Sequence, residues 1–184
     1  FPGILSRFIN FLTLPVTTSY LALADFGFIA IFQLCIIPFR ISTEFGVGYI
    51  INSKWFNYNL KQRKELIFSI LFTGAIISSF FGVILWLFTD IIFQFLVGDD
   101  WGKIKLLSNY LFLYVIILIP NPIFDIWAII QQKAILNSVI RVIELVSLTI
   151  STVWFAINTQ NYELIIISTV CVSFFISLIK YFIL

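Results

Sequence analysis

Arg40 has the type and position that promise the most chemistry in this chain. It lies near the middle of an otherwise apolar stretch from about Gly27 to Ile50. A charge at the centre of a membrane helix costs roughly 2.5 to 3.5 kcal/mol on insertion scales, so an arginine without a purpose is rare there. The planar guanidinium offers five donors and suits an anionic group such as a phosphate. Arg40 is therefore the first candidate for binding a negatively charged substrate.

Glu44 lies four residues after Arg40, on the same face of a helix. One interpretation is an ion pair within the helix that partly hides both charges. In the other, Arg40 faces a water-filled interior and Glu44 releases it when an anion arrives. Both interpretations can hold together, so Glu44 is also a candidate substrate-binding residue.

Arg7 is a third candidate, about one turn inside the first apolar segment. Its long side chain can snorkel to the headgroups, which is a sufficient structural explanation. Polar residues nevertheless continue from it toward the other end of the segment, and this favours a helix that lines a wet interior. These residues are Asn10, Thr13, Thr17 and Thr18.

Asp125 is the fourth candidate and closes an unusual group inside the fourth apolar segment, where it follows Pro120, Asn121 and Pro122. Interior prolines remove backbone hydrogen bonds and kink helices. Broken helices line the binding sites of many transporters, although a kink that serves packing alone is an equal alternative. An acid inside a membrane pairs or takes up protons, and snorkelling beside Trp127 is the other explanation for Asp125.

The remaining charges point to structure rather than to catalysis. Arg141 and Glu144 are three residues apart, and we expect an interfacial ion pair between them. The chain has no histidine and no GxxxxGK[ST] loop, so the commonest general base and metal ligand and the phosphate loop of ATPases are missing. We expect no enzyme, no cofactor, no metal site and no nucleic-acid partner.

The composition is typical of a membrane protein. Hydrophobic residues make up 61% of the 184 residues and charged residues only 11%, whereas soluble domains average about 25% charged residues. We predict an all-α, polytopic membrane protein with about six spans, because a spanning helix needs about 20 apolar residues. The predicted spans are Ile4–Leu23, Gly27–Ile50, Leu66–Phe88, Leu106–Ile130, Val142–Ile157 and Leu164–Ile183. Residues 89–97 either prolong the third helix or lie along the interface.

The distribution of charge predicts the topology. Basic residues follow the second and fourth spans and face the cytoplasm by the positive-inside rule: Lys54, Lys61, Arg63, Lys64 and Lys133. Both ends of the chain then lie on the cytoplasmic side. Trp55 and Trp127 fall near inner ends of spans, as expected for rings at headgroup level. The chain lacks methionine and stops inside an apolar run, so we expect it to be a piece of a longer protein.

Small residues recur at four-residue spacing in three of the predicted spans. Helices in lipid associate through close approach along such faces, so we expect these spans to pack against neighbours. The residues are Gly74, Ser78 and Gly82 in the third span, Ser147 and Ser151 in the fifth, and Thr169, Ser173 and Ser177 in the sixth.

Three short strings carry a resemblance to a known family. They are Tyr20–Gly27 (YLALADFG), Glu44–Tyr49 (EFGVGY) and Phe93–Trp101 (FQFLVGDDW). They resemble the polysaccharide flippases, the O-antigen and capsule repeat-unit exporters of the superfamily that also holds multidrug exporters. In that family a polar residue, an aromatic and a glycine close the first helix, and a glycine-containing turn closes the second. A glycine and acidic residues precede an aromatic between the third and fourth helices.

The resemblance implies a fold and a function. Residues 1–184 would form the N-terminal six-helix lobe of a two-lobe transporter in the bacterial inner membrane. Such a transporter moves an undecaprenyl-pyrophosphate-linked oligosaccharide from the cytoplasmic to the outer leaflet by alternating access. The implied partners are this lipid-linked oligosaccharide, membrane lipids and other glycan-assembly proteins. Cationic side chains of the cavity meet the pyrophosphate, a role that falls here to Arg40, with Arg7 second.

Three alternatives stay open from the sequence. A multidrug exporter of the same superfamily would place acids rather than an arginine at the cavity centre. A membrane-embedded glycan polymerase or ligase would need long outer loops. A structural membrane subunit would turn Arg40 toward a neighbouring acid and away from water.

Overall fold

The computed structural model describes residues 2–44, 47–97, 109–111 and 113–184, with most of their side chains. These residues contain helices and no strand. The helices are α1 (Pro2–Tyr20), α2 (Leu23–Glu44), α3 (Val47–Lys54), α4 (Leu60–Val97), α6 (Pro120–Ile130), α7 (Ala134–Asn158) and α8 (Tyr162–Ile183). A 3₁₀ turn, η1 (Trp55–Asn57), follows α3, and residues 109–111 and 113–117 are also helical.

Within the described part of the chain, four helical segments are long and apolar enough to cross a membrane. They are Leu60–Phe88, Asn109–Ile130, Ala134–Asn158 and Tyr162–Ile183. The described apolar part of α2, Leu23–Ile37, is shorter. Helices suit this composition because every backbone N–H and C=O in lipid needs a partner within the protein, and a helix supplies these partners itself. The prediction of an all-α chain with several apolar helices is confirmed at this level.

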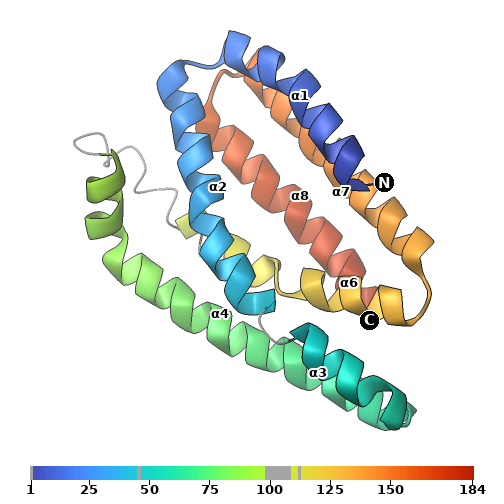
Figure 1. Ribbon diagram of the computed structural model, residues 1–184. Coiled ribbons are helices and arrows are strands. Elements are labelled where there is room, and N and C mark those ends of the chain that lie inside the picture. The colour runs from blue at the N-terminus through green and yellow to red at the C-terminus, as the bar shows by residue number, and fades with distance from the viewer. Residues whose placement is uncertain (1, 45–46, 98–108, 112) are drawn as a thin grey trace.

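The helices form a tight group with one long helix along its edge (Figure 1). Helix α7 packs against α8 and also against α1, and α2 contacts α8. Helix α4 runs along the lower edge in Figure 1 and reaches the group through α2 and α6. The α1–α2 and α7–α8 connections lie at one end of the molecule. The α6–α7 connection, η1 and the C-terminus lie at the other end.

The largest buried cluster lies at the end that holds η1 and α6. Its residues come from α3, η1, α4, α6, α7 and α8, and include Ile51, Trp55, Ile67, Phe124, Trp127 and Ile176. Trp55 and Trp127 thus contact the protein rather than the surroundings, while the expectation that they lie near headgroup level stays a prediction. They are buried in the protein because α3 and α6 pack on each other and enclose them.

Two helices extend well beyond the predicted apolar spans. Helix α7 begins at Ala134 rather than Val142, and α4 covers residues 60–97 rather than 66–88. Residues 60–65 at the start of α4 are mostly lysine, glutamine, arginine and glutamate, and residues 134–141 at the start of α7 include alanine, leucine and arginine. These residue types are good helix formers, so both helices begin before their predicted spans. Residues 89–97 are helical and continue α4, and this end of α4 turns away from its long run in Figure 1. Whether the stretch lies along the interface stays a prediction.

The small-residue faces of α4 and α8 do pack against neighbours, as predicted. Ser78 on α4 and both Ser173 and Ser177 on α8 are buried. A methyl group added at Gly74 would lie 3.1 Å from the Ile119 side chain. Close approach at this glycine brings α4 against the segment that leads into α6. Ser147 and Ser151 on α7 are half-buried.

Candidate functional site

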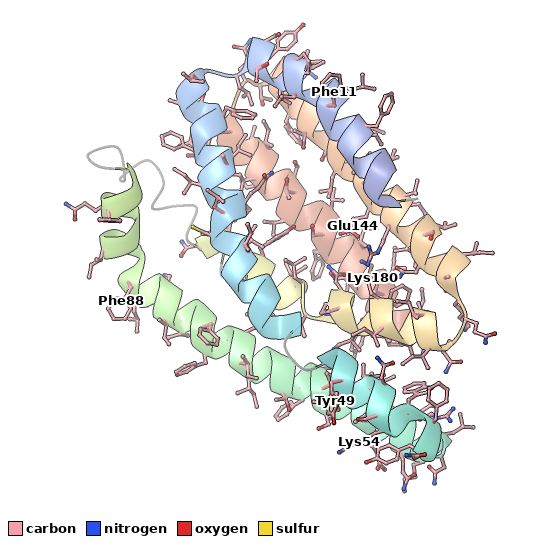
Figure 2. The ribbon with its side chains drawn as sticks, viewed as in Figure 1. Phe11, Tyr49, Lys54, Phe88, Glu144 and Lys180 are labelled. Atoms are coloured by element: carbon pink, nitrogen blue, oxygen red, sulfur yellow. The ribbon has the colours of Figure 1, made fainter. Side chains whose placement is uncertain are left out.

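Lys180 is the most deeply buried charged residue among the described side chains, at 2% exposure. Its Nζ donates to Asn121 Oδ1 at 2.8 Å and to Glu144 Oε2 at 3.1 Å. Figure 2 shows Glu144 and Lys180 close together in the space between α7 and α8. We call these three residues the lysine cluster. It places an amine, a carboxylate and an amide in contact inside an otherwise apolar helix group.

Three different helices position the cluster. Lys180 is in the last turn of α8, Glu144 lies on α7, and Asn121 is in the first turn of α6. Because each helix supplies one side chain, a relative movement of any two helices changes the geometry of the cluster. The cluster therefore reports on how α6, α7 and α8 are arranged.

A helix break places Asn121. The turn at residues 118–119 precedes α6, where Ile119 N–H donates to Ile116 at 3.3 Å and Asn121 N–H to Leu118 at 3.1 Å. Pro120 and Pro122 have no N–H to continue the regular ladder. The sequence prediction of an interruption at these prolines is confirmed. Pro15, in contrast, lies inside an uninterrupted α1.

The electrostatics of the cluster depend on mutual compensation. Desolvating an ion costs several kcal/mol even in a relaxed protein, and only good geometry with further hydrogen bonds offsets this cost. The side chains of Lys180 and Glu144 are 3% and 20% exposed, so water screens the pair weakly. The Asn121 amide oxygen adds a second acceptor. Two of the three N–H bonds of the ammonium thus have acceptors.

A polar stripe leads from the cluster along α8. Ser177 and Ser173 precede Lys180 by three and seven residues, which places all three on one helix face. Ser173 Oγ donates to the Tyr114 hydroxyl at 3.3 Å. Ser177 Oγ is buried and has no hydrogen-bond partner among the described residues. A buried hydroxyl without a partner is costly, so this position suits a water molecule or a polar ligand group.

A second ion pair lies nearer the α6–α7 connection. Arg141 Nη2 is 2.6 Å from Asp125 Oδ2, and Nε donates to Asp125 Oδ1 at 3.3 Å, which makes a two-point contact. Asp125, a predicted substrate-binding residue, is therefore paired across helices, in line with the reading that an acid at this depth pairs. The exposure of the two side chains is 48% and 23%.

The expected ion pair between Arg141 and Glu144 is wrong. The two residues are neighbours on α7, but Arg141 pairs with α6 and Glu144 with α8. On a helix, positions three residues apart differ by about 60° in direction. Each charge therefore faces a different neighbouring helix. Arg141 pairs with Asp125 and Glu144 pairs with Lys180, in place of an ion pair within α7.

The structure describes the backbone but not the side chains of the other three predicted site residues. The backbones of Arg7, Arg40 and Glu44 belong to α1 and α2, but their side chains lie outside the described part of the structure. The threonines of the polar stripe on α1 are described. Thr13, Thr17 and Thr18 donate to carbonyl groups one turn back on the same helix at 2.8–3.0 Å. These bonds satisfy the hydroxyl donors without a wet interior.

Lys180 is the main residue that the sequence analysis missed. It stands inside the apolar run Leu164–Leu184, so the argument applied to Arg40 applies to it equally. It lies near the end of its apolar run, however, and the sequence analysis gave it no role. Among the described residues, no group of three or more His, Cys, Asp or Glu side chains is placed to hold a metal ion.

Comparison with known proteins does not assign the chain. No family model, no curated protein and no solved structure matches it.

Proposed function

We propose that this chain is the N-terminal lobe of a membrane transporter that flips a pyrophosphate-linked oligosaccharide lipid from the cytoplasmic to the outer leaflet of the bacterial inner membrane. The lysine cluster is the observation that carries the proposal. The resemblance of three sequence strings to polysaccharide flippases supplies the substrate class. The four long apolar helices agree with a membrane location.

The lysine cluster supports transport because ionisable groups inside a membrane are rare and usually mark a substrate or ion pathway. Lys180, Glu144 and Asn121 come from three helices and meet beside a helix interrupted by prolines. Interrupted helices at polar sites are a recurrent feature of transporters. A phosphate oxygen bears the same kind of charge as Glu144, so an anionic headgroup competes with this carboxylate for the ammonium.

The proposal includes a division of roles among the cations. Arg40 and Arg7 hold the pyrophosphate, and Glu44 releases Arg40 as the anion arrives. When the helices rearrange, the Lys180 ammonium releases the Glu144 carboxylate and binds the anionic group of the substrate. Asp125 holds Arg141 at the edge of the same helix group. With α1 and α2 as two further spans, the proposed lobe has six spans and both ends on the cytoplasmic side.

The test compares transport with folding in the full-length protein. The variants are Lys180→Met, the double variant Lys180→Met/Glu144→Met, and Arg40→Ala. Export is measured in proteoliposomes as the appearance of a fluorescent lipid-linked oligosaccharide in the outer leaflet. Folding is followed by circular dichroism and thermal unfolding. We expect the double variant and Arg40→Ala to fold as the wild type and to lose export.

The double variant separates transport from a purely structural role. Two apolar residues of similar volume can replace a buried ion pair at little cost in stability. If the pair only holds helices together, the folded double variant exports normally, and the proposal fails. Cation-driven drug efflux without any flipping of the oligosaccharide lipid would instead favour the multidrug-exporter alternative.

A further inference from the structure

Exposed apolar and basic side chains gather at the turn that joins α3 to α4. We call residues 54–65 the basic elbow. Phe56 and Leu60 are 71% and 76% exposed, and both are large apolar side chains. Lys54, Lys61 and Lys64 are exposed beside them. Figure 2 shows Lys54 at the outer tip of this turn, far from the lysine cluster.

A buried tryptophan holds the elbow on the protein. Trp55 is buried in the cluster that also contains Ile51 and Trp127. Arg63 Nε donates to the Trp55 carbonyl at 2.9 Å, and its guanidinium carbon lies 5.2 Å from the centroid of the Trp55 ring. Arg63 is thus engaged inside the elbow, while the three lysines face outward.

A reciprocal cap fixes the start of α4. Asn59 N–H donates to Gln62 Oε1 at 3.0 Å, and Gln62 N–H donates to Asn59 Oδ1 at 2.9 Å. This capping box satisfies two backbone donors at the helix start. The turn that carries Phe56 and Leu60 is therefore preorganised, and no large ordering cost opposes the docking of a ligand on it.

The charge of the elbow is strongly positive. Residues 54–65 contain four cations, Lys54, Lys61, Arg63 and Lys64, and one acid, Glu65. The elbow includes the first residues of the apolar helix segment Leu60–Phe88, which is long enough to span a membrane. Basic residues at the end of a span are typical of the membrane surface. Orientation by positive charge accounts for the lysines alone. It does not account for two large apolar side chains that are held outward among them.

We propose that the basic elbow is a docking site for anionic phospholipid. The three lysines bind the phosphate groups, and Phe56 and Leu60 enter the boundary between headgroups and acyl chains. A surface with cations on one side and apolar anchors on the other is the combination that binds anionic membrane interfaces. A nucleic acid would use the charges but leave the anchors in water, and an acidic protein would need an apolar groove of its own to cover them. The docking site is independent of the proposed transport function.

The test measures lipid selectivity in the full-length protein. The probes are spin-labelled phosphatidylglycerol and spin-labelled phosphatidylcholine in phosphatidylcholine bilayers. The motionally restricted fraction gives the relative association of each lipid with the protein. We expect the wild type to prefer phosphatidylglycerol several-fold, and the preference to fall as salt rises to about 0.5 M, because salt screens exposed charges.

Variants locate the selectivity. In Lys54→Gln/Lys61→Gln/Lys64→Gln we expect the preference to fall nearly to one, with unchanged thermal unfolding because these side chains are exposed. Lys133→Gln is the matched control for Lys61→Gln. Lys133 is an exposed lysine at the same end of the molecule but outside the elbow, and its Nζ lies 4.8 Å from the centroid of the Trp127 ring. We expect Lys61→Gln to have the larger effect. Phe56→Ser should weaken the association of both lipids.

Three outcomes would overturn the docking site. The first is an unchanged preference for phosphatidylglycerol in the triple variant. The second is an equal loss in Lys133→Gln and Lys61→Gln, which would assign selectivity to general charge. Binding of a soluble protein partner through the elbow, without lipid selectivity, would also count against it. Loss of export in the Arg40→Ala test bears on none of these results, so the two proposals fail separately.

Discussion

Two ion pairs connect α7 to its neighbours less than a full turn apart, and the largest difference between them is the burial of the cation. Arg141 meets Asp125 at 2.6 Å, while Lys180 meets Glu144 at the longer distance of 3.1 Å. The side chain of Arg141 is 48% exposed and that of Lys180 only 3%. The shorter contact is therefore the one that water screens. Burial, and not distance, decides which pair the protein depends on.

The pairs differ in what surrounds each ion when the pair separates. When an exposed pair separates, both ions recover water, and measured contributions of such pairs are about 0–1 kcal/mol. When a buried pair loses one member, the other remains without compensation in a medium of low polarity. The four predictions below test this contrast, beginning with the largest expected effect.

Lys180→Met should be the most damaging single change in the described part of the chain that involves a charge. It leaves Glu144 partly buried and without its cation, and we expect a loss of about 3–5 kcal/mol in the free energy of unfolding. Titration with sodium dodecyl sulfate, followed by circular dichroism, measures this quantity in micelles. A loss below about 1 kcal/mol would show that the pair behaves as an exposed one.

Asn121→Ala should cost about 1.5–3 kcal/mol, the usual range for a hydrogen bond to a charged group. The change removes one of the two acceptors of the Lys180 ammonium but keeps Glu144. The same titration gives the value, and Asn109→Ala serves as an exposed asparagine control. If the two variants are equally stable, the hydrogen bond from Lys180 to Asn121 contributes nothing to the stability of the protein.

Lys180→Met/Glu144→Met should recover most of the stability that the single change loses, to within about 1 kcal/mol of the wild type, because no unpaired charge remains. A double-mutant cycle with Glu144→Met gives the interaction energy directly. Additive losses in the cycle would mean that the two side chains act independently, and the comparison between the pairs would then lose its basis.

Arg141→Gln should have the smallest effect, about 0–1 kcal/mol, because its pair with Asp125 is accessible to water. The wild-type contribution should also shrink as salt is raised, whereas the effect of Lys180→Met should change little. Unfolding titrations at low and high salt separate the two. A large, salt-independent loss in Arg141→Gln would reverse the ranking of the pairs.

The helical architecture was predictable because hydrophobic runs and flanking charges act locally. The interruption at Pro120 and Pro122 was predictable for the same reason, since a proline removes its own N–H. Partners across helices were not predictable. Arg141 and Glu144 are neighbours in sequence, but the directions in which they leave α7 decide that one meets Asp125 and the other Lys180.

The candidate site shows the same limit of local reasoning. The depth argument singled out Arg40 because it is central in its apolar segment, and it gave no role to Lys180, which lies near the end of another. Snorkelling requires a free path to the surface. Asn121 and Glu144 lie in contact with the Lys180 ammonium, and only the packing of three helices reveals this.

The length of α4 has a mechanical consequence. Its apolar stretch Leu60–Phe88 has 29 residues and extends about 44 Å at about 1.5 Å per residue, whereas the hydrocarbon layer is about 30 Å thick. Held upright, this stretch alone exceeds the layer by about 14 Å, or roughly nine residues. The last part of α4 turns away from this stretch (Figure 1) and adds little length along the same axis. A span that is too long for the layer tilts or bends, and α4 has the bend.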